Sequence, residues 1–242
     1  MQAVKKHSSL LWCAIFSIAM GYLEAIVVIY LRELYYPQGF QFPITPGMQR
    51  IIGFEWLREM ATIIMLIAIA IIAGKNKFQR FFYFFYCFGI WDIFYYIALK
   101  HLIGWPDSFF TFDILFLIPI TWIAPVLAPV ICSVIFVTFS FLIIGFENAE
   151  ELKIKKWQWL IFWSGNLIVF ISFVWDFGSL IISNGYLPKL LTLTSDKSFQ
   201  ELIALYIPQK FRWGLFIGGE ILVTLFFLLV FLEGLKFRLD FF

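Results

Sequence analysis

Six stretches of the chain are apolar for about 20 residues or more, and this feature limits the fold more than any other. A helix needs about 20 apolar residues to cross a hydrocarbon core of about 30 Å. The six stretches are Leu10–Tyr35, Ile51–Gly74, Phe81–Gly104, Asp113–Gly145, Trp157–Ser183 and Arg212–Leu235. They predict an all-α fold, a polytopic transmembrane helical bundle with about six spans, which forms a single domain over residues 1–242.

The composition agrees with a chain whose main partner is the lipid bilayer. Hydrophobic residues make up 62% of the 242 residues and charged residues 14%. A soluble domain is nearer to about half apolar and about a quarter charged. The formal net charge of +2 is too small to indicate a nucleic-acid partner. The sequence does not identify a protein partner.

Lysine and arginine gather in the connections on one side of the predicted bundle. These basic residues are Lys5, Lys6, Lys75, Lys77, Arg80, Lys153, Lys155, Lys156, Lys236 and Arg238. Connections rich in lysine and arginine stay in the cytoplasm when a membrane protein inserts. We therefore predict a multi-pass membrane protein with both termini in the cytoplasm.

The fourth apolar stretch, Asp113–Gly145, contains Pro119, Pro125 and Pro129. Proline removes a backbone hydrogen-bond donor and clashes with the preceding turn of a helix. We therefore expect this span to be kinked or broken. Its length leaves two alternatives open, a single bent span or a short re-entrant half-helix followed by the main span.

A short amphipathic helix is predicted over residues 198–207, in the connection before the last span. Ser198 and Glu201 have the spacing of a capping box, and Pro208 ends the segment. The apolar residues that share one face are Phe199, Leu202, Ile203, Tyr206 and Ile207. Such a helix either lies on the outer membrane interface or packs over the mouth of the bundle.

Ionisable side chains occur inside the predicted spans, where they are costly and normally face the bundle interior or a water-filled cavity. A rise of about 1.5 Å per residue places all of them between the midplane and the outer face. The candidate binding residues, including two phenols beside one carboxylate, are Glu24, Glu55, Arg58, Glu59, Asp92, Tyr95, Tyr96, Asp176 and Glu220. Their similar depth predicts one shared cavity.

Helical spacing supports this interpretation. Glu55, Arg58 and Glu59 form one polar stripe on the second span, and Asp92 has both phenols one turn further along the third. The alternative for the second span is an ion-pair ladder at the start of a helix, where acidic residues are favoured by the helix dipole.

Two other polar groups have structural alternatives that do not involve a ligand. Asp113 follows a loop and begins an apolar stretch, so we expect it to act as a helix N-cap. Glu220 lies next to a GxxxG pair, Gly214 and Gly218, which indicates close helix packing. In that setting Glu220 could form a hydrogen bond between helices.

The acidic groups outnumber Arg32 and Arg58, so several of them need a cation, a proton or hydrogen-bond donors. A hard divalent cation with oxygen ligands would fit, as would carboxylic acids kept neutral by burial. The sequence shows no haem, nucleotide or histidine-based zinc signature, so the cofactor, the metal and the catalytic residues are unknown.

Several motifs resemble a pattern in an uncharacterised family of bacterial polytopic membrane proteins. They are Gly89-Ile-Trp-Asp-Ile-Phe-Tyr-Tyr96, Gly104-Trp-Pro106, Asp113-Ile-Leu-Phe-Leu-Ile-Pro119, Trp122-Ile-Ala-Pro-Val-Leu-Ala-Pro129 and Glu55-Trp-Leu-Arg-Glu-Met-Ala-Thr62. The resemblance covers roughly residues 20–130. It implies a location in the bacterial cytoplasmic (inner) membrane, and it implies no activity.

Three functions agree with these features. The first is binding or transport of a cation, a proton or a polar headgroup in an outward-facing acidic cavity. The second is a membrane-embedded enzyme that uses carboxylates on a lipid or isoprenoid substrate, and a side opening between helices would favour it. The third is an accessory subunit of a membrane complex.

Overall fold

The computed structural model describes residues 2–36, 39, 40, 42, 43, 49–146, 153–188, 193 and 196–239. Within these residues it contains seven helices and one two-stranded sheet, and six of the helices are long and apolar enough to cross a membrane. The elements are α1 (Gln2–Tyr35), α2 (Gln49–Ala73), α3 (Lys77–Ile103), β1 (Phe112–Phe116), β2 (Trp122–Pro125), α4 (Leu127–Gly145), α5 (Lys156–Ser183), α6 (Lys197–Ile203) and α7 (Trp213–Leu239). The predicted helical bundle with six spans is confirmed.

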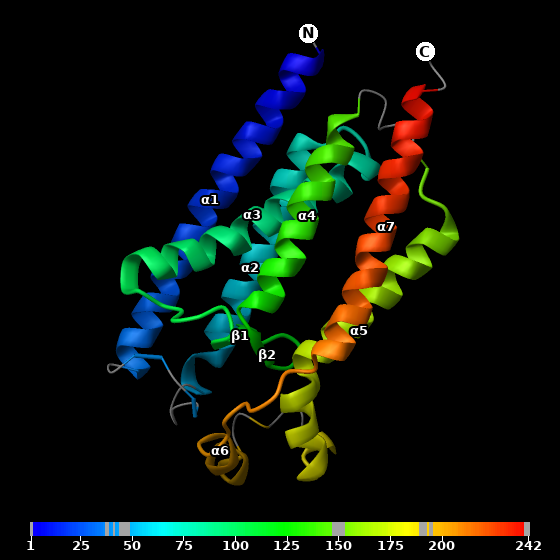
Figure 1. Cartoon of the computed structure of the whole chain (residues 1–242). Helices are drawn as coiled ribbons and strands as arrows, with labels where there is room; N and C mark the ends of the chain where they lie inside the picture. Colours follow the sequence, from blue (N-terminus) through cyan, green and yellow to red (C-terminus); the bar gives the residue numbers. More distant parts are fainter. Residues whose placement is uncertain are drawn as a thin grey trace.

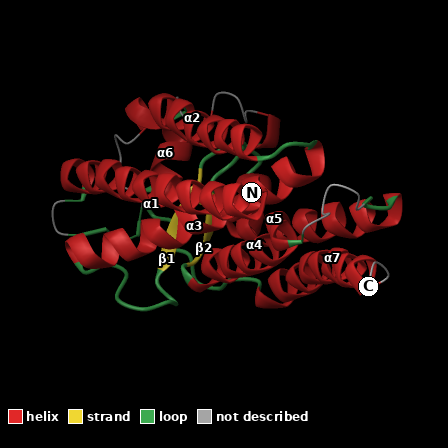
Figure 2. Cartoon of the chain, turned by 90° about the horizontal axis from the view of Figure 1, so that it is seen from above, coloured by secondary structure: helices red, strands yellow, loops and turns green. Residues whose placement is uncertain are grey.

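Helix α3 is the centre of one half of the bundle, because it packs against α1, α2 and α4. Helix α7 packs along α5 and also contacts α4, so α4 joins the two groups. Seen from above, α2 and α7 lie at opposite sides of the molecule (Figure 2). The described chain begins and ends at the same end of the bundle, and the β-hairpin and α6 lie toward the other end (Figure 1).

The fourth apolar stretch does not cross the bundle as one helix. Its first part forms an antiparallel hairpin, in which Phe112 pairs with Pro125 and Asp113 with Ala124, and only Leu127–Gly145 is helical. Pro119 lies in the connection between the two strands, and Pro129 lies in the first turn of α4, where proline is tolerated. The break therefore precedes the helix, and a hairpin takes the place of the expected kink or half-helix.

The prediction for the connection before the last span is partly wrong. Helix α6 has seven residues rather than ten, and Asp196 caps it by accepting hydrogen bonds from the backbone N–H groups of Ser198 and Phe199. The expected capping box is therefore not what starts this helix. Phe199 is buried with Phe177 and Ile181 of α5, so this part of the apolar face packs on the bundle.

Close packing between α5 and α7 depends on two glycines. A Cβ atom added at Gly219 would lie 2.8 Å from the carbonyl oxygen of Gly165, and one added at Gly165 would lie 2.9 Å from the carbonyl oxygen of Gly219. In contrast, a Cβ atom at Gly214 or Gly218 would have no neighbour within 4 Å. The expected GxxxG pair is thus not the contact, and the packing glycine is the next residue along.

We expect Gly219→Ala to lower the thermal stability of the purified protein. The added methyl group must push α5 and α7 apart, and overpacking of this kind costs about 1–3 kcal/mol. Gly218→Ala is the matched control, because it makes the same change in helix propensity at an open position. Equal thermal unfolding temperatures for the two variants in the same detergent would contradict this account of the interface.

Candidate functional site

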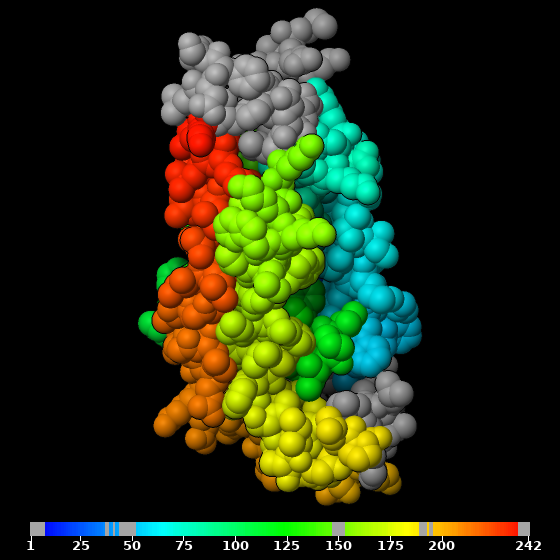
Figure 3. All heavy atoms as spheres, turned by 90° about the vertical axis from the view of Figure 1, so that its right-hand side faces the viewer, coloured from blue at the N-terminus to red at the C-terminus, as the bar shows by residue number. Residues whose placement is uncertain are grey.

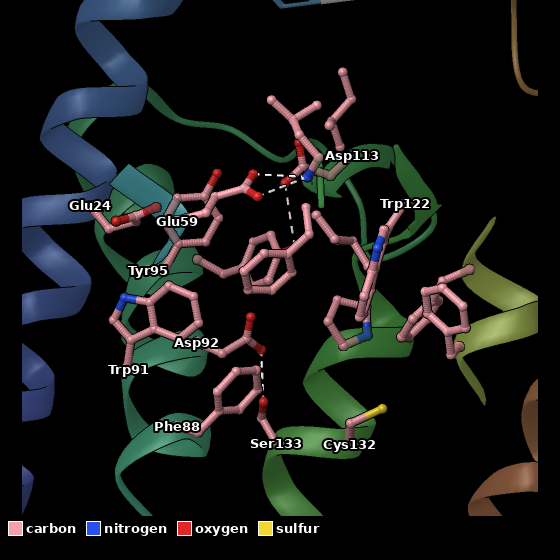
Figure 4. Close-up of a pocket in the computed structure, with 18 of the residues that line it drawn as sticks. Glu24, Glu59, Phe88, Trp91, Asp92, Tyr95, Asp113, Trp122, Cys132 and Ser133 are labelled. Atoms are coloured by element: carbon pink, nitrogen blue, oxygen red, sulfur yellow. Dashed lines mark hydrogen bonds between the residues drawn. The ribbon is translucent and has the colours of Figure 1, made fainter. Parts of the chain in front are cut away.

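A cavity of about 510 Å³ lies among the helices and is lined by residues of α1, α2, α3, the hairpin, α4, α5 and α7. Eight of the nine predicted binding residues line it, which are Glu24, Glu55, Arg58, Glu59, Asp92, Tyr95, Tyr96 and Glu220. Figure 4 shows Glu24, Glu59, Asp92 and Tyr95 on one wall and Trp122 on the other. The helices therefore bring these polar stripes together at one cavity.

Arg58 forms ion pairs with two carboxylates at this site, and its single positive charge offsets one of their two negative charges. Its guanidinium forms ion pairs with Glu24 of α1 and with Glu55 of α2, the latter with 2.8 Å between Nη2 and Oε2. Thr62, one turn further along α2, donates a hydrogen bond to Glu24 over 3.3 Å. The polar stripe of α2 thus includes an ion-pair ladder, and it also faces the cavity.

Arg32 and Asp113 form a second ion pair, which joins α1 to β1. The Nη2 and Oδ1 atoms are 3.3 Å apart, and Tyr96 donates a hydrogen bond to the other oxygen of Asp113. The Arg32 guanidinium also lies 3.8 Å from the ring centre of Trp105. A cation in this position is attracted by the negative face of the aromatic ring. Asp113 is 2% exposed and belongs to a strand, so its expected role as a helix N-cap is wrong.

Burial raises the pKa of Asp113 to about 6, because loss of water outweighs the attraction of Arg32 and the hydrogen bonds from Tyr96 and the backbone of Ile114. The folded protein therefore takes up a proton at Asp113 at a higher pH than the unfolded chain does.

Glu59 connects α2 to the tip of the hairpin. Both of its carboxylate oxygens accept the backbone N–H of Leu117, at 2.8 and 3.1 Å, and the residue is 5% exposed. These hydrogen bonds are drawn in Figure 4. The Glu59 carboxylate therefore fixes the chain just after β1. The backbone N–H of Leu117 gains the hydrogen-bond acceptor that it needs away from water.

Asp92 lies on α3, further from the hairpin than Glu59 and Asp113 (Figure 4). Its Oδ2 atom accepts a hydrogen bond from Ser133 of α4 over 2.8 Å. Figure 4 shows its carboxylate pointing into the cavity, with Trp91 and Tyr95 on one side and Phe88 below. Among the described residues, no salt bridge is found for Asp92 or for Glu59.

Glu220 of α7 reaches the same cavity from the opposite side. Cys132 of α4 donates a hydrogen bond to its Oε1 atom over 2.8 Å, and the residue is 6% exposed. Its Oε2 atom is buried and has no hydrogen-bond partner among the described residues. The expected hydrogen bond between helices is therefore present, although it satisfies only one of the two oxygens.

Asp176 does not join this group. Its carboxylate accepts a hydrogen bond of 2.7 Å from Tyr206, in the segment that follows α6. Asp176 is absent from the described residues that line the cavity. Its contact links α5 to the segment after α6 and has a structural explanation.

The cavity is open on the side of the bundle. Trp163 and Leu167 of α5 line it, yet they are also 62% and 57% exposed, so they stand at its mouth. Figure 3 shows the corresponding hollow between α5, in yellow-green, and α2, in cyan. Phe84, Phe85 and Phe88 of α3 continue the apolar wall inward. The opening therefore faces the region that lipid occupies around a membrane helix.

The described residues do not favour a metal centre. Within the described ranges, no group of three His, Cys, Asp or Glu side chains is placed so that it could hold a metal ion. The acids at the cavity instead contact arginine, hydroxyl, thiol and backbone donors. The expectation of a divalent cation gains no support from this geometry.

Sequence reasoning omitted three groups from the candidate site. The sequence predicts only that Arg32 neutralises a carboxylate and that Asp113 caps a helix, and it does not indicate Ser133. Asp113 stands in the apolar run Phe112–Leu117, so the argument that selected Asp92 applies to it equally. The position of Ser133 opposite Asp92 follows from helix packing, and we find no local signal for it.

Comparison of the chain with protein-family models, with curated proteins and with solved structures found no match. The function must therefore be inferred from the geometry of the chain itself.

We expect Asp113 to change how stability depends on pH. Because its pKa is raised in the folded state, its contribution to stability grows as pH falls from 7.5 to 5, by about 1 kcal/mol. Asp113→Asn should lack this contribution, so the unfolding temperature of the wild type should rise relative to this variant over that range.

The exposed Asp107 offers a control, since Asp107→Asn makes the same chemical change at the protein surface. Parallel profiles for the wild type and Asp113→Asn in thermal unfolding at pH 7.5, 6 and 5 would contradict the raised pKa of Asp113.

Proposed function

We propose that the protein binds an amphipathic lipid, with the polar headgroup at the charged cluster and the hydrocarbon chain along the aromatic wall. We define the charged cluster as Glu24, Arg32, Glu55, Arg58, Glu59, Asp92 and Asp113. The observation that carries this proposal is the combination, in one cavity, of that cluster with a side opening between α5 and α2. A ligand that fits both parts must itself be polar at one end and apolar at the other.

The size of the cavity supports a ligand of this kind. Sites for small molecules usually have volumes of about 300–1,000 Å³ and few polar groups among many apolar ones. The present cavity, at about 510 Å³, suits a headgroup with the first part of a chain, and the rest of the chain would extend through the mouth at Trp163 and Leu167.

The sequence predicts either a site for a polar headgroup or an enzyme that acts on a lipid. The proposal combines the headgroup of the first function with the lipid of the second. We propose binding rather than catalysis because the cavity defines a place for a ligand, whereas the contacts among the described residues define no atom that reacts.

To test lipid binding, we would fill the cavity from α5 with Asn166→Trp. Asn166 lines the cavity, so the indole should occupy the place of the chain and remove lipid that stays bound after exchange into nonionic detergent. Leu160→Trp is the matched control, because Leu160 lies on α5 and is 68% exposed. Bound lipid would be counted by native mass spectrometry.

A wild-type protein that carries no lipid after reconstitution into lipid and mild extraction would contradict the proposal. Equal lipid occupancy in the wild type and in Asn166→Trp would place any bound lipid elsewhere.

We also propose that the protein lies in the bacterial cytoplasmic membrane with both termini in the cytoplasm. The lysine and arginine bias supports this orientation, and the resemblance to bacterial polytopic proteins supports this location. The hairpin end of the bundle, with the charged cluster, would then face outward.

The orientation predicts which single cysteines a membrane-impermeant maleimide can reach in intact cells. The native cysteines Cys13, Cys87 and Cys132 are buried, so they should react little with the maleimide. Labelling of an introduced cysteine can therefore be measured above a low background. Ser108→Cys, in the exposed connection before β1, should be labelled, and Lys75→Cys should be labelled only after permeabilisation. The reverse pattern would overturn the proposed orientation.

A further inference from the structure

We infer that the ligand of this cavity is a neutral lipid whose polar end is a hydroxyl group, which donates a hydrogen bond to Asp92 and accepts one from Tyr95. This inference rests on the proposed lipid binding and names the chemical class of the polar end. It follows from an oxygen of Asp92 that a ligand can reach, from the unpaired hydroxyl of Tyr95 and from the pairing of the two arginines at the cavity.

Asp92 offers a hydrogen-bond acceptor to the cavity. Ser133 donates to its Oδ2 atom over 2.8 Å, and we find no donor to Oδ1 among the described residues. Asp92 is partly exposed, its Oδ1 is not among the enclosed atoms that lack a partner, and Figure 4 shows the carboxylate pointing into the cavity. The free oxygen of Glu220 is different, because protein encloses it. A ligand in the cavity can therefore reach Oδ1 of Asp92.

Tyr95 places a second polar group near this acceptor. It follows Asp92 by three residues on α3, and side chains at this spacing are neighbours on one face of a helix. Tyr95 lines the cavity and is partly exposed, and its hydroxyl has no hydrogen-bond partner among the described residues. Tyr96, in contrast, donates to Asp113. A ligand hydroxyl can donate to Asp92 and accept from Tyr95 at the same time.

The cavity has no free cation for an anionic headgroup. Arg32 and Arg58 are the only basic side chains among the described residues that line it. Arg58 is paired with Glu24 and Glu55, and Arg32 is paired with Asp113. A carboxylate or a phosphate next to Asp92 would therefore be a buried charge without a partner, and such a charge is costly.

An ammonium headgroup fits poorly for a different reason. It has three N–H donors, and each donor that is buried without an acceptor is costly. Within the described ranges, no three His, Cys, Asp or Glu side chains are grouped so that they could surround one ion. A hydroxyl has a single donor, which Asp92 alone can satisfy. Ser133 already serves the other oxygen of Asp92 with the same chemistry.

The test compares four lipids that share one oleyl chain and differ at the polar end, on the full-length protein in nonionic detergent. The probes are oleyl alcohol, its methyl ether, which lacks the donor, oleylamine and oleate. We expect the alcohol to bind at least about tenfold more tightly than each of the others, because a hydrogen bond to a charged acceptor is among the strong ones. Competition would be followed by native mass spectrometry, and binding that Asn166→Trp abolishes is assigned to the cavity.

Two variants assign the preference for the alcohol over the methyl ether to residues. Asp92→Leu should reduce it to about twofold or less, because the acceptor is gone while the side-chain volume is similar. Tyr95→Phe should reduce it by about threefold, because one of two hydrogen bonds is lost. Asp107→Leu is the control, since Asp107 is an exposed acid outside the cavity lining, and it should keep the wild-type preference.

The outcomes separate this inference from the proposed function. If the four lipids bind the wild type equally, lipid binding stands and the hydroxyl is wrong, and tighter binding of oleylamine or oleate would replace it with a charged headgroup. If none binds in the cavity, the proposed function itself fails. An unchanged preference in folded Asp92→Leu or Tyr95→Phe would overturn the role of that residue. The comparison on the wild type decides the class of polar end even if a variant does not fold.

Discussion

The cost of removing charge from water governs the arrangement of this bundle. Six carboxylates line a cavity inside helices whose surfaces are otherwise apolar, and each must meet a cation, a hydrogen-bond donor or a ligand. Arg32 and Arg58 satisfy three of them. The remaining acids receive neutral donors from a backbone N–H, a hydroxyl and a thiol. These partners come from different elements, so the relative positions of the elements are tied to the same electrostatic requirement.

The hairpin is the element that this requirement explains best. A two-stranded sheet has little stability alone, and backbone groups without partners are costly near a bilayer interior. Asp113 on β1 is tied to α1 by Arg32, and Leu117 after β1 is tied to α2 by Glu59. Trp122 on β2 packs against Phe170 and Phe173 of α5, so the hairpin connects both groups of helices and borders the side opening.

The spans and most of the cavity could be predicted from the sequence, because apolar length fixes the spans and helical spacing fixes which residues share a face. Helical spacing does not determine which neighbouring element a helix face contacts. The sequence predicts a similar depth for Asp176 and the other acids, yet its carboxylate meets Tyr206 rather than the cavity. Moving one residue along a helix turns the side chain by about 100°, and so Gly219 packs on α5 while Gly218 does not. The hairpin escaped prediction because a short apolar run before prolines fits a strand or a broken helix equally well.

The bond between Glu59 and Leu117 involves the main chain on one side only. Glu59 recognises an amide N–H that every amino acid except proline possesses, and the side chain of Leu117 takes no part in the hydrogen bond. The tip of the hairpin can thus change its side chains, and with them the shape of the cavity wall, without losing its attachment to α2. Substitution of the side chain at position 117 should therefore keep this contact, whereas loss of the carboxylate at position 59 removes it.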